Sequence, residues 1–174
     1  MLEKFFSKKV DYEIVPMEMA HCRPASVIHG ERFSRGWSDG EFHELIGQET
    51  VGGFVALQAG QPALNGVAGF VLSRTAAGES EILSIGVNAR VERQGLGWRL
   101  MRAALADIVA RDAQTVFLEV DETNASAKAL YAKLGFVKVA ERPAYYAAPD
   151  GRKTAAHVMR LDLTVSRFGR SGKP

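Results

Sequence analysis

The chain has 174 residues, of which 47% are hydrophobic and 24% are charged, and its formal net charge is +2. This composition is ordinary for a globular protein and predicts one domain with a sizeable core, and the small net charge gives no support for direct nucleic-acid binding. No apolar run approaches the ~20 residues of a membrane helix, and a single cysteine excludes an internal disulfide.

The first half of the chain combines short helices and strands after an N-terminal extension, residues 1–10. The extension lacks the continuous apolar core and the small-residue cleavage site of a secretory signal, which favours a cytoplasmic location. Cys22 is expected to be a small core side chain rather than a reactive nucleophile. The elements predicted up to residue 87 are a strand at 11–17, a helix at 18–29 interrupted by Pro24, a helix at 39–48, and strands at 51–58, 66–73 and 81–87.

The second half contains the clearest helix, at 96–111, with an apolar stripe formed by Leu96, Leu100, Ala104 and Ile108. A strand at 114–120, a helix at 124–134 and strands at 136–141 and 155–162 follow. Strands that alternate with helices predict a mixed α/β sheet, and residues 11–163 are expected to form a single domain. The basic tail, residues 164–174, is predicted to be disordered rather than a contact for RNA or an acidic partner.

Residues 82–97, ILSIGVNARVERQGLG, carry the strongest functional signal. An apolar strand leads through a polar turn into a helix, whose first backbone N–H groups have no intrahelical partners and attract negative charge. Gly95 and Gly97 remove the Cβ atoms that would block a phosphate, and Arg93 adds a cation. The segment therefore predicts a pyrophosphate cradle, with contacts expected from Arg93, Gln94, Gly95, Leu96, Gly97 and Trp98.

Other phosphate-binding loops fit this segment less well. A dinucleotide-binding turn needs a glycine where Leu100 stands, and a Walker loop needs a Gly-Lys-Ser/Thr end; an ordinary helix start is the structural alternative. The segment resembles the Gln/Arg-x-x-Gly-x-Gly/Ala motif with which the GCN5-related N-acetyltransferase (GNAT) superfamily binds the pyrophosphate of coenzyme A. Glu92 departs from that motif, and we expect it to point outward.

A second block strengthens the resemblance. Asn124 to Phe136 read Asn-x-x-Ala-x-x-Leu-Tyr-x-x-x-Gly-Phe, similar to the fourth conserved block of the same superfamily, with Asn124 as a helix N-cap and Gly135 as a C-terminal cap. The strings LEV, ALY, LGF, RPAYY and DGR, and GWS followed by EF, resemble the RimI-type ribosomal-protein-alanine N-acetyltransferases. The resemblance covers most of residues 11–163, while the insert at 58–65 has no counterpart.

The resemblance implies a fold and a cosubstrate. The fold is a mixed sheet of about seven strands with about four helices, in the order β-α-α-β-β-β-α-β-α-β-β. The strands at 81–87 and 114–120 are expected to splay apart around acetyl-CoA. The four histidines show no metal-ligand spacing, so no metal is assigned.

Acetyl transfer to an amine requires a neutral nucleophile, a stabilised oxyanion and a proton for the departing thiolate. Glu119 stands alone among apolar residues and matches the general base of RimI-type enzymes; a solvated strand residue is the alternative. Tyr131 matches the general acid of the superfamily, although its position alone indicates packing. Asn124 is expected to bind the pantetheine arm or to cap its helix. The oxyanion is expected to be held by a backbone N–H on the strand around Ile85, Gly86 and Val87.

The acceptor side is assigned by analogy to Trp37, Glu41, Tyr145 and Tyr146, and the two tyrosines cannot both face inward because neighbours on a strand alternate. The predicted activity is acetylation of a protein N-terminus, with the N-terminal alanine of a small-subunit ribosomal protein of the S18 type as acceptor. One alternative is a small-molecule N-acetyltransferase for a polyamine, amino acid or antibiotic. The other is a noncatalytic acetyl-CoA-binding regulatory domain, against which Glu119 and Tyr131 argue.

Overall fold

The computed structural model describes residues 10–164. The strands are Tyr12–Pro16 (β1), Val51–Gln58 (β2), Val67–Ala76 (β3), Glu79–Val87 (β4), Thr115–Asp121 (β5), Val137–Ala147 (β6) and Lys153–Asp162 (β7). The helices are Cys22–Arg32 (α1), Asp39–Ile46 (α2), Ala63–Gly66 (α3), Leu96–Ala110 (α4) and Ala125–Lys133 (α5), with short 3-10 turns at Met19–His21 (η1) and Ala89–Val91 (η2). The predicted order of elements is confirmed, with the four-residue helix α3 and the two 3-10 turns as additions.

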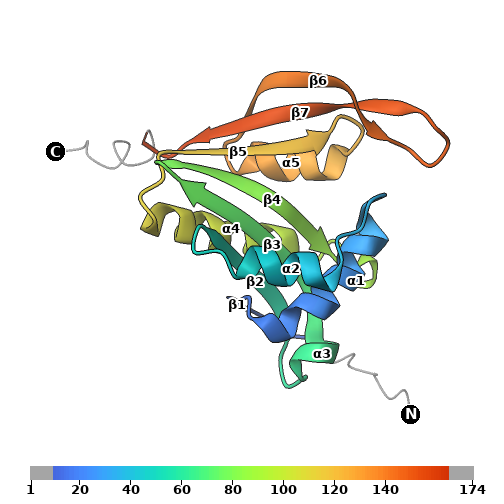
Figure 1. Ribbon diagram of the computed structural model, residues 1–174, viewed down its shortest axis with the longest axis vertical. Helices are drawn as coiled ribbons and strands as arrows, with labels where there is room; N and C mark the ends of the chain where they lie inside the picture. Colours follow the sequence, from blue (N-terminus) through green and yellow to red (C-terminus); the bar gives the residue numbers. More distant parts are fainter. Residues whose placement is uncertain (1–9, 165–174) are drawn as a thin grey trace, which may run out of the picture.

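The seven strands form one sheet in the order β1-β2-β3-β4-β5-β7-β6. All neighbours are antiparallel except β4 and β5, which are parallel and pair only from Glu79 to Glu81 with Thr115 to Phe117. Beyond these three pairs the two strands diverge, which gives the sheet the open V visible in Figure 1. The predicted splay between these strands is therefore confirmed.

Helices cover the sheet from both sides and create two apolar clusters. α4 and α5 pack on one face, where the predicted stripe of Leu96, Leu100, Ala104 and Ile108 is fully buried. α1 and α2 pack on the opposite face, over a smaller cluster that includes Cys22, which is completely enclosed as expected. Because strand side chains alternate, neighbouring residues such as Val55 and Ala56 of β2 contribute to different clusters.

Two local predictions are corrected. Pro24 does not interrupt the first helix, which continues to Arg32, because Pro24 lies in the first turn where a backbone N–H has no intrahelical partner to lose. The last hairpin is much longer than predicted: β6 runs to Ala147 and β7 begins at Lys153, so that Tyr145 and Tyr146 lie on a strand. All but one residue of the proposed tail and of the proposed N-terminal extension lie outside the described residues, and the domain limits stay a prediction.

Candidate active site

The candidate active site is the gap where β4 and β5 part. β3 continues beside β4 as far as Val87, and β7 continues beside β5 as far as Asp121, but nothing pairs across the gap after Glu81 and Phe117. Alternate residues of β4 therefore turn their backbone N–H and C=O groups into the gap. The residues predicted to hold an oxyanion, Ile85, Gly86 and Val87, all lie in this unpaired stretch.

The loop from β4 to α4 forms an open helix start. Arg93 and Gly95 have positive φ angles of 62° and 76°, and α4 begins directly after Gly95 without a side-chain cap or an acidic residue in its first turn. A Cβ atom at Gly97 would meet only Leu130 Cδ2, at 3.4 Å, which is an ordinary contact. Protein packing thus does not fill the space before α4, and its free N–H groups suit a pyrophosphate.

The side chains around this helix start differ in what they can offer a ligand. Leu96 is 2% exposed and packs in the core, so that only its backbone is available, whereas Arg93, Gln94 and Trp98 are exposed. Glu92 is exposed as predicted, and Arg32 at the end of α1 pairs with it, with Nη2 2.5 Å from Oε1. This ion pair balances the negative charge of Glu92 and links the end of α1 to the loop between β4 and α4.

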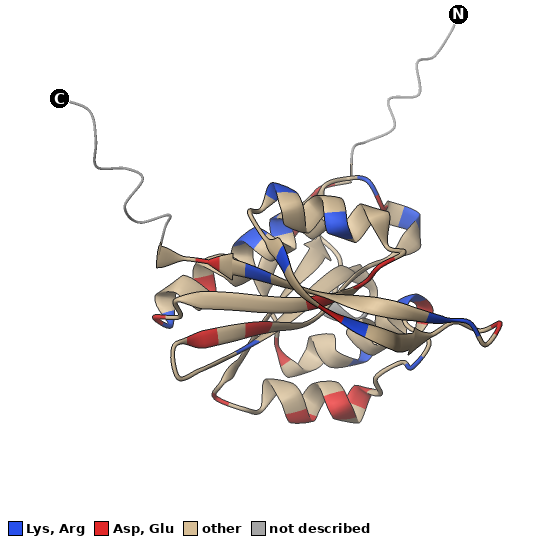
Figure 2. Cartoon of the chain, turned by 90° about the horizontal axis from the view of Figure 1, so that it is seen from above, with Lys and Arg blue, Asp and Glu red and all other residues tan. Residues whose placement is uncertain are grey.

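The helices on the two faces of the sheet also differ in charge. α2 carries three acidic residues and no Lys or Arg, whereas α5 carries two lysines and no acid. Figure 2 shows the two kinds of charge on opposite sides of the sheet. The face that contains the open start of α4 is therefore the more favourable one for phosphate groups.

α5 supplies two of the predicted site residues. Asn124 accepts a hydrogen bond from Ala127 N–H at 3.1 Å, which confirms its N-cap role, and its Nδ2 has no partner among residues 10–164. Tyr131 is 5% exposed and packs edge-on against Phe136. Burial, with a smaller effect from Tyr146, raises the pKa of Tyr131 to about 12, so its hydroxyl keeps its proton at neutral pH.

Glu119 meets a cation that the sequence did not single out as a site residue. Arg142 Nε lies 2.8 Å from Glu119 Oε1, and the two side chains are 59% and 22% exposed respectively. The Arg142 guanidinium lies over the ring of Tyr145, whose centroid is 5.6 Å away, and Tyr145 contacts Tyr146 edge-on. Burial and then Glu119 raise the pKa of Tyr146 to about 12. The sequence feature that could have identified Arg142 is its position, three residues before two adjacent tyrosines.

Glu119 and Tyr131 approach the gap from opposite faces of the sheet. Leu118 and Val120 point into the α4 and α5 cluster together with Tyr131, and the alternation along β5 leaves Glu119 half-buried on the other face. Electrostatic effects link Tyr146 to both groups, because Tyr146 contributes to the raised pKa of Tyr131 and Glu119 contributes to that of Tyr146. The two predicted catalytic residues therefore lie on β5, which borders the gap, and on the helix that follows it, on opposite faces of the sheet.

The remaining acceptor-side residues are Trp37, in the loop between α1 and α2, and Glu41, in the first turn of α2. Trp37 is half-buried, stacks on His29 and packs against Phe42. Glu41 completes a capping box, in which its Oε2 accepts from Ser38 N–H at 2.7 Å, and these hydrogen bonds lower its pKa. Glu41 thus has a structural role of its own, and its contact with an acceptor stays a prediction.

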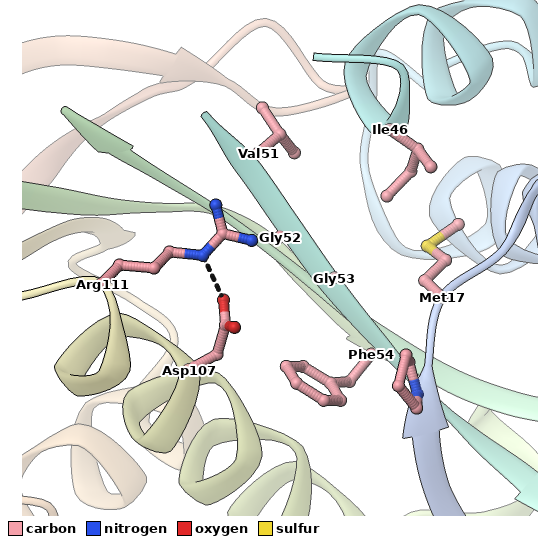
Figure 3. Close-up of a pocket in the computed structure, with 9 residues that line it drawn as sticks. Met17, Ile46, Val51, Gly52, Gly53, Phe54, Asp107 and Arg111 are labelled. Atoms are coloured by element: carbon pink, nitrogen blue, oxygen red, sulfur yellow. Dashed lines mark hydrogen bonds and ion pairs between the residues drawn. The ribbon is translucent and has the colours of Figure 1, made fainter. Parts of the chain in front are cut away.

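A separate cavity of about 230 Å³ lies between β2, α2 and α4 (Figure 3). An ion pair on α4 lines one wall (Figure 3), with Arg111 Nε 2.8 Å from Asp107 Oδ2, and Arg111 also donates to the carbonyl oxygen of Glu49. At about 1.5 Å per residue, Asp107 stands roughly 15 Å along α4 from Gly97. This cavity is therefore distinct from the gap.

Within residues 10–164, no group of three or more His, Cys, Asp or Glu side chains is arranged to hold a metal ion. Over the same part of the chain, none of the helices has the length and apolar character needed to cross a membrane.

Comparisons with known proteins agree with this geometry. Residues 24–136 match the family described as the acetyltransferase (GNAT) family. The chain is 32% identical over 129 residues to the [ribosomal protein bS18]-alanine N-acetyltransferase of Escherichia coli (strain K12), covering 74% of this chain and 82% of that protein. The crystal structure of the ribosomal-protein-S18-alanine N-acetyltransferase from Escherichia coli superposes with a TM-score of 0.78 at 29% identity, over 88% of this chain and 94% of that one.

A more distant structure shares the fold. Arabidopsis thaliana NAA60 in complex with acetyl-CoA also has a TM-score of 0.78, at 16% identity, over 88% of this chain and 99% of that one.

Proposed function

The chain belongs to the acetyltransferase (GNAT) family and is an acetyl-CoA-dependent N-acetyltransferase, and on that premise we propose that it acetylates the N-terminal alanine of a ribosomal protein of the S18 type. The name of the Escherichia coli relative supports this acceptor. A cytoplasmic location belongs to the same proposal, because ribosomal proteins are made there.

One observation supports the proposal: a half-buried carboxylate on β5, which borders the gap, and a buried, protonated tyrosine on the following helix lie on opposite faces of the sheet. The open start of α4 opens towards the Tyr131 face, which assigns that face to the cofactor. Glu119, with Trp37 in the loop between α1 and α2, then belongs to the acceptor face. A proton acceptor on the amine side and a proton donor on the thiol side are what acetyl transfer requires.

The chain's own groups would bind and orient both substrates. Acetyl-CoA supplies the thioester-linked acetyl group. The N–H groups that begin α4, with Arg93 beside them, would hold the pyrophosphate, and Asn124 Nδ2 would donate to the pantetheine arm. A backbone N–H within residues 85–87 would donate to the carbonyl oxygen as negative charge develops on it, because alternate groups of this stretch face the gap already oriented.

Glu119 and Tyr131 would move the protons. Glu119 Oε2, which has no partner among the described residues, accepts a proton from the α-ammonium directly or through water. The neutral nitrogen then bonds to the carbonyl carbon, the carbon–sulfur bond breaks, and the nitrogen loses its second proton to the solvent to leave a neutral amide. Tyr131 donates its proton to the departing sulfur and regains one from the solvent, so that the reaction releases one proton overall.

A thiol-release assay with a matched acceptor panel tests the proposal. The panel contains short peptides that begin with Ala, Ser, Leu or Lys, an N-terminally blocked peptide with an internal lysine, a polyamine and an aminoglycoside. We expect acetylation at the α-amine of the Ala-starting peptide, because a small first residue lets the amine approach beside Glu119. Efficient turnover of the polyamine or aminoglycoside, with none of the Ala-starting peptide, would replace the proposal by the small-molecule alternative.

A further inference from the structure

His29 stands at the centre of an aromatic cluster between α1 and α2. Its side chain is 3% exposed, and its ring stacks on Phe33 and on Trp37 with centroid distances of 4.3 and 4.6 Å and interplanar angles of 25° and 15°. Phe42 and Phe70 pack farther out, at 5.8 and 5.9 Å. The ring therefore contacts both ends of the loop formed by residues 33–38, which we call the acceptor loop.

A hydrogen bond fixes the same loop through its backbone. Trp37 N–H donates to His29 Nδ1 at 3.0 Å, which requires a neutral imidazole with its proton on Nε2. Burial lowers the pKa of His29 to about 4, although the nearby Glu41 carboxylate opposes this effect. The imidazole is thus a hydrogen-bond acceptor at neutral pH.

The acceptor loop stands beside the candidate active site. Phe70 of the cluster is the β-sheet partner of Gly86, and a Cβ atom at Gly86 would lie 2.8 Å from the Phe70 ring. The ion pair of Arg32 and Glu92 holds the start of the loop against the helix start of the cofactor side. Figure 1 shows the connection between α1 and α2 next to the carboxyl end of β4, where the gap opens.

We propose that His29 is a positioning residue, which holds Trp37 and the acceptor loop in place as one wall of the groove for the acceptor peptide. This inference rests on the proposed function, because it names what shapes the acceptor side of the same site. It assigns to His29 an effect on peptide binding that acts through Trp37 and does not reach the cofactor.

Three substitutions of His29 distinguish the effect of its hydrogen bond from the effect of its aromatic ring. His29→Phe keeps an aromatic ring and removes the acceptor nitrogen. His29→Asn places an amide oxygen near the position of Nδ1, whereas His29→Gln carries its oxygen one bond farther out, so these two variants lose the ring equally and differ in the acceptor atom. His43→Asn, on the exposed side of α2, is the matched control.

The measurements are the KM for an Ala-starting peptide at saturating acetyl-CoA, the Kd for CoA by calorimetry, and amide hydrogen exchange at Trp37. We expect His29→Phe and His29→Gln to raise the peptide KM about three- to tenfold, the equivalent of one ordinary hydrogen bond, and to speed exchange at Trp37. His29→Asn and the control should stay near the wild-type KM, and the Kd for CoA should not change in any variant.

Equal peptide KM values for His29→Asn and His29→Gln, or a parallel loss of CoA affinity, would overturn the inference. Failure of the proposed function gives a different result, in which the wild-type protein acetylates no Ala-starting peptide. Even then, unchanged exchange at Trp37 in His29→Phe would refute the positioning role, because the hydrogen bond would not be what fixes the loop.

Discussion

Replacing Tyr131 by phenylalanine removes one hydroxyl and keeps the ring that packs against Phe136, with centroids 6.0 Å apart. The side chain is 5% exposed, and burial raises the pKa of its hydroxyl to about 12. At pH 7 only about one hydroxyl in 10⁵ is ionised, so a proton is present for the departing thiolate in essentially every molecule. The substitution should therefore remove a proton donor with little disturbance of the core.

A general acid typically contributes about 10²–10⁴-fold to the rate, which corresponds to roughly 3–5 kcal/mol of barrier. We expect the kcat of Tyr131→Phe to fall within this range, while the Kd for acetyl-CoA and the Tm stay close to the wild-type values. Because the pKa of Tyr131 is about 12, its ionisation should produce no decline in the wild-type rate up to about pH 10.

Steady-state thiol release measures kcat, and calorimetry with CoA measures binding separately. Tyr12→Phe is the matched control, because Tyr12 is a similarly buried tyrosine on β1, away from the gap. A Tyr131→Phe enzyme with an unchanged kcat would refute the assignment and show that water, or another group, protonates the thiolate.

Three further predictions address the other groups. Glu119→Gln should lower kcat/KM for the peptide about 10²-fold at pH 7. The loss should be smaller at pH 9, where α-amines with reference pKa values of roughly 7.7–8.0 are already neutral. A pH-rate profile with the same loss at every pH would assign deprotonation of the amine to another group. Gly97→Leu should weaken acetyl-CoA binding about tenfold or more in calorimetry, because the side chain would occupy the phosphate site. The Tm should stay nearly constant, since a Cβ atom at this position meets only Leu130, at 3.4 Å. An unchanged affinity would place the phosphates elsewhere. Burial lowers the pKa of His29 from 6.5 to about 4, so the unfolded chain binds the extra proton between these values and the free energy of unfolding falls as the pH drops, by up to about 3 kcal/mol. Urea unfolding at pH 7 and at pH 4.5 measures this loss of unfolding free energy, which His29→Phe should lack. A smaller loss should remain, because burial also lowers the pKa of His21. Identical losses in the wild-type protein and the variant would contradict the assignment.

Local patterns predicted much of the fold because local spacing determines it. The stripe from Leu96 to Ile108 repeats at helical spacing and is buried, and the predicted strand at 51–58 matches β2 in both its limits. Gly95 and Gly97 indicated an open helix start from residue type alone, and the positive φ of Gly95 agrees with that interpretation. In each case the residues that decide the structure are neighbours in sequence.

The parts that the sequence did not predict depend on pairing between distant residues. The register between β6 and β7 shifts between Arg142 and Tyr146, with Ala144 at a φ of 52°, and no local pattern announces this irregularity. The ion pair of Arg142 with Glu119 joins strands that are not adjacent in the sheet. Likewise, the hydrogen bond from Trp37 to His29 requires the chain to fold back between two helices.

The placement of Glu119 and Tyr131 on opposite faces of the sheet could have been predicted from the sequence. Leu118 and Val120 are apolar, and a strand places every second residue on the same face, so Glu119 must point away from the face they occupy. α5 follows β5 and packs on that apolar face, which puts Tyr131 on the opposite side of the sheet from Glu119. In a continuous sheet the backbone would lie between a base and an acid placed in this way. The loss of pairing between β4 and β5 opens the sheet at this point, and the same divergence leaves alternate β4 amides facing the gap in which we propose that the carbonyl reacts.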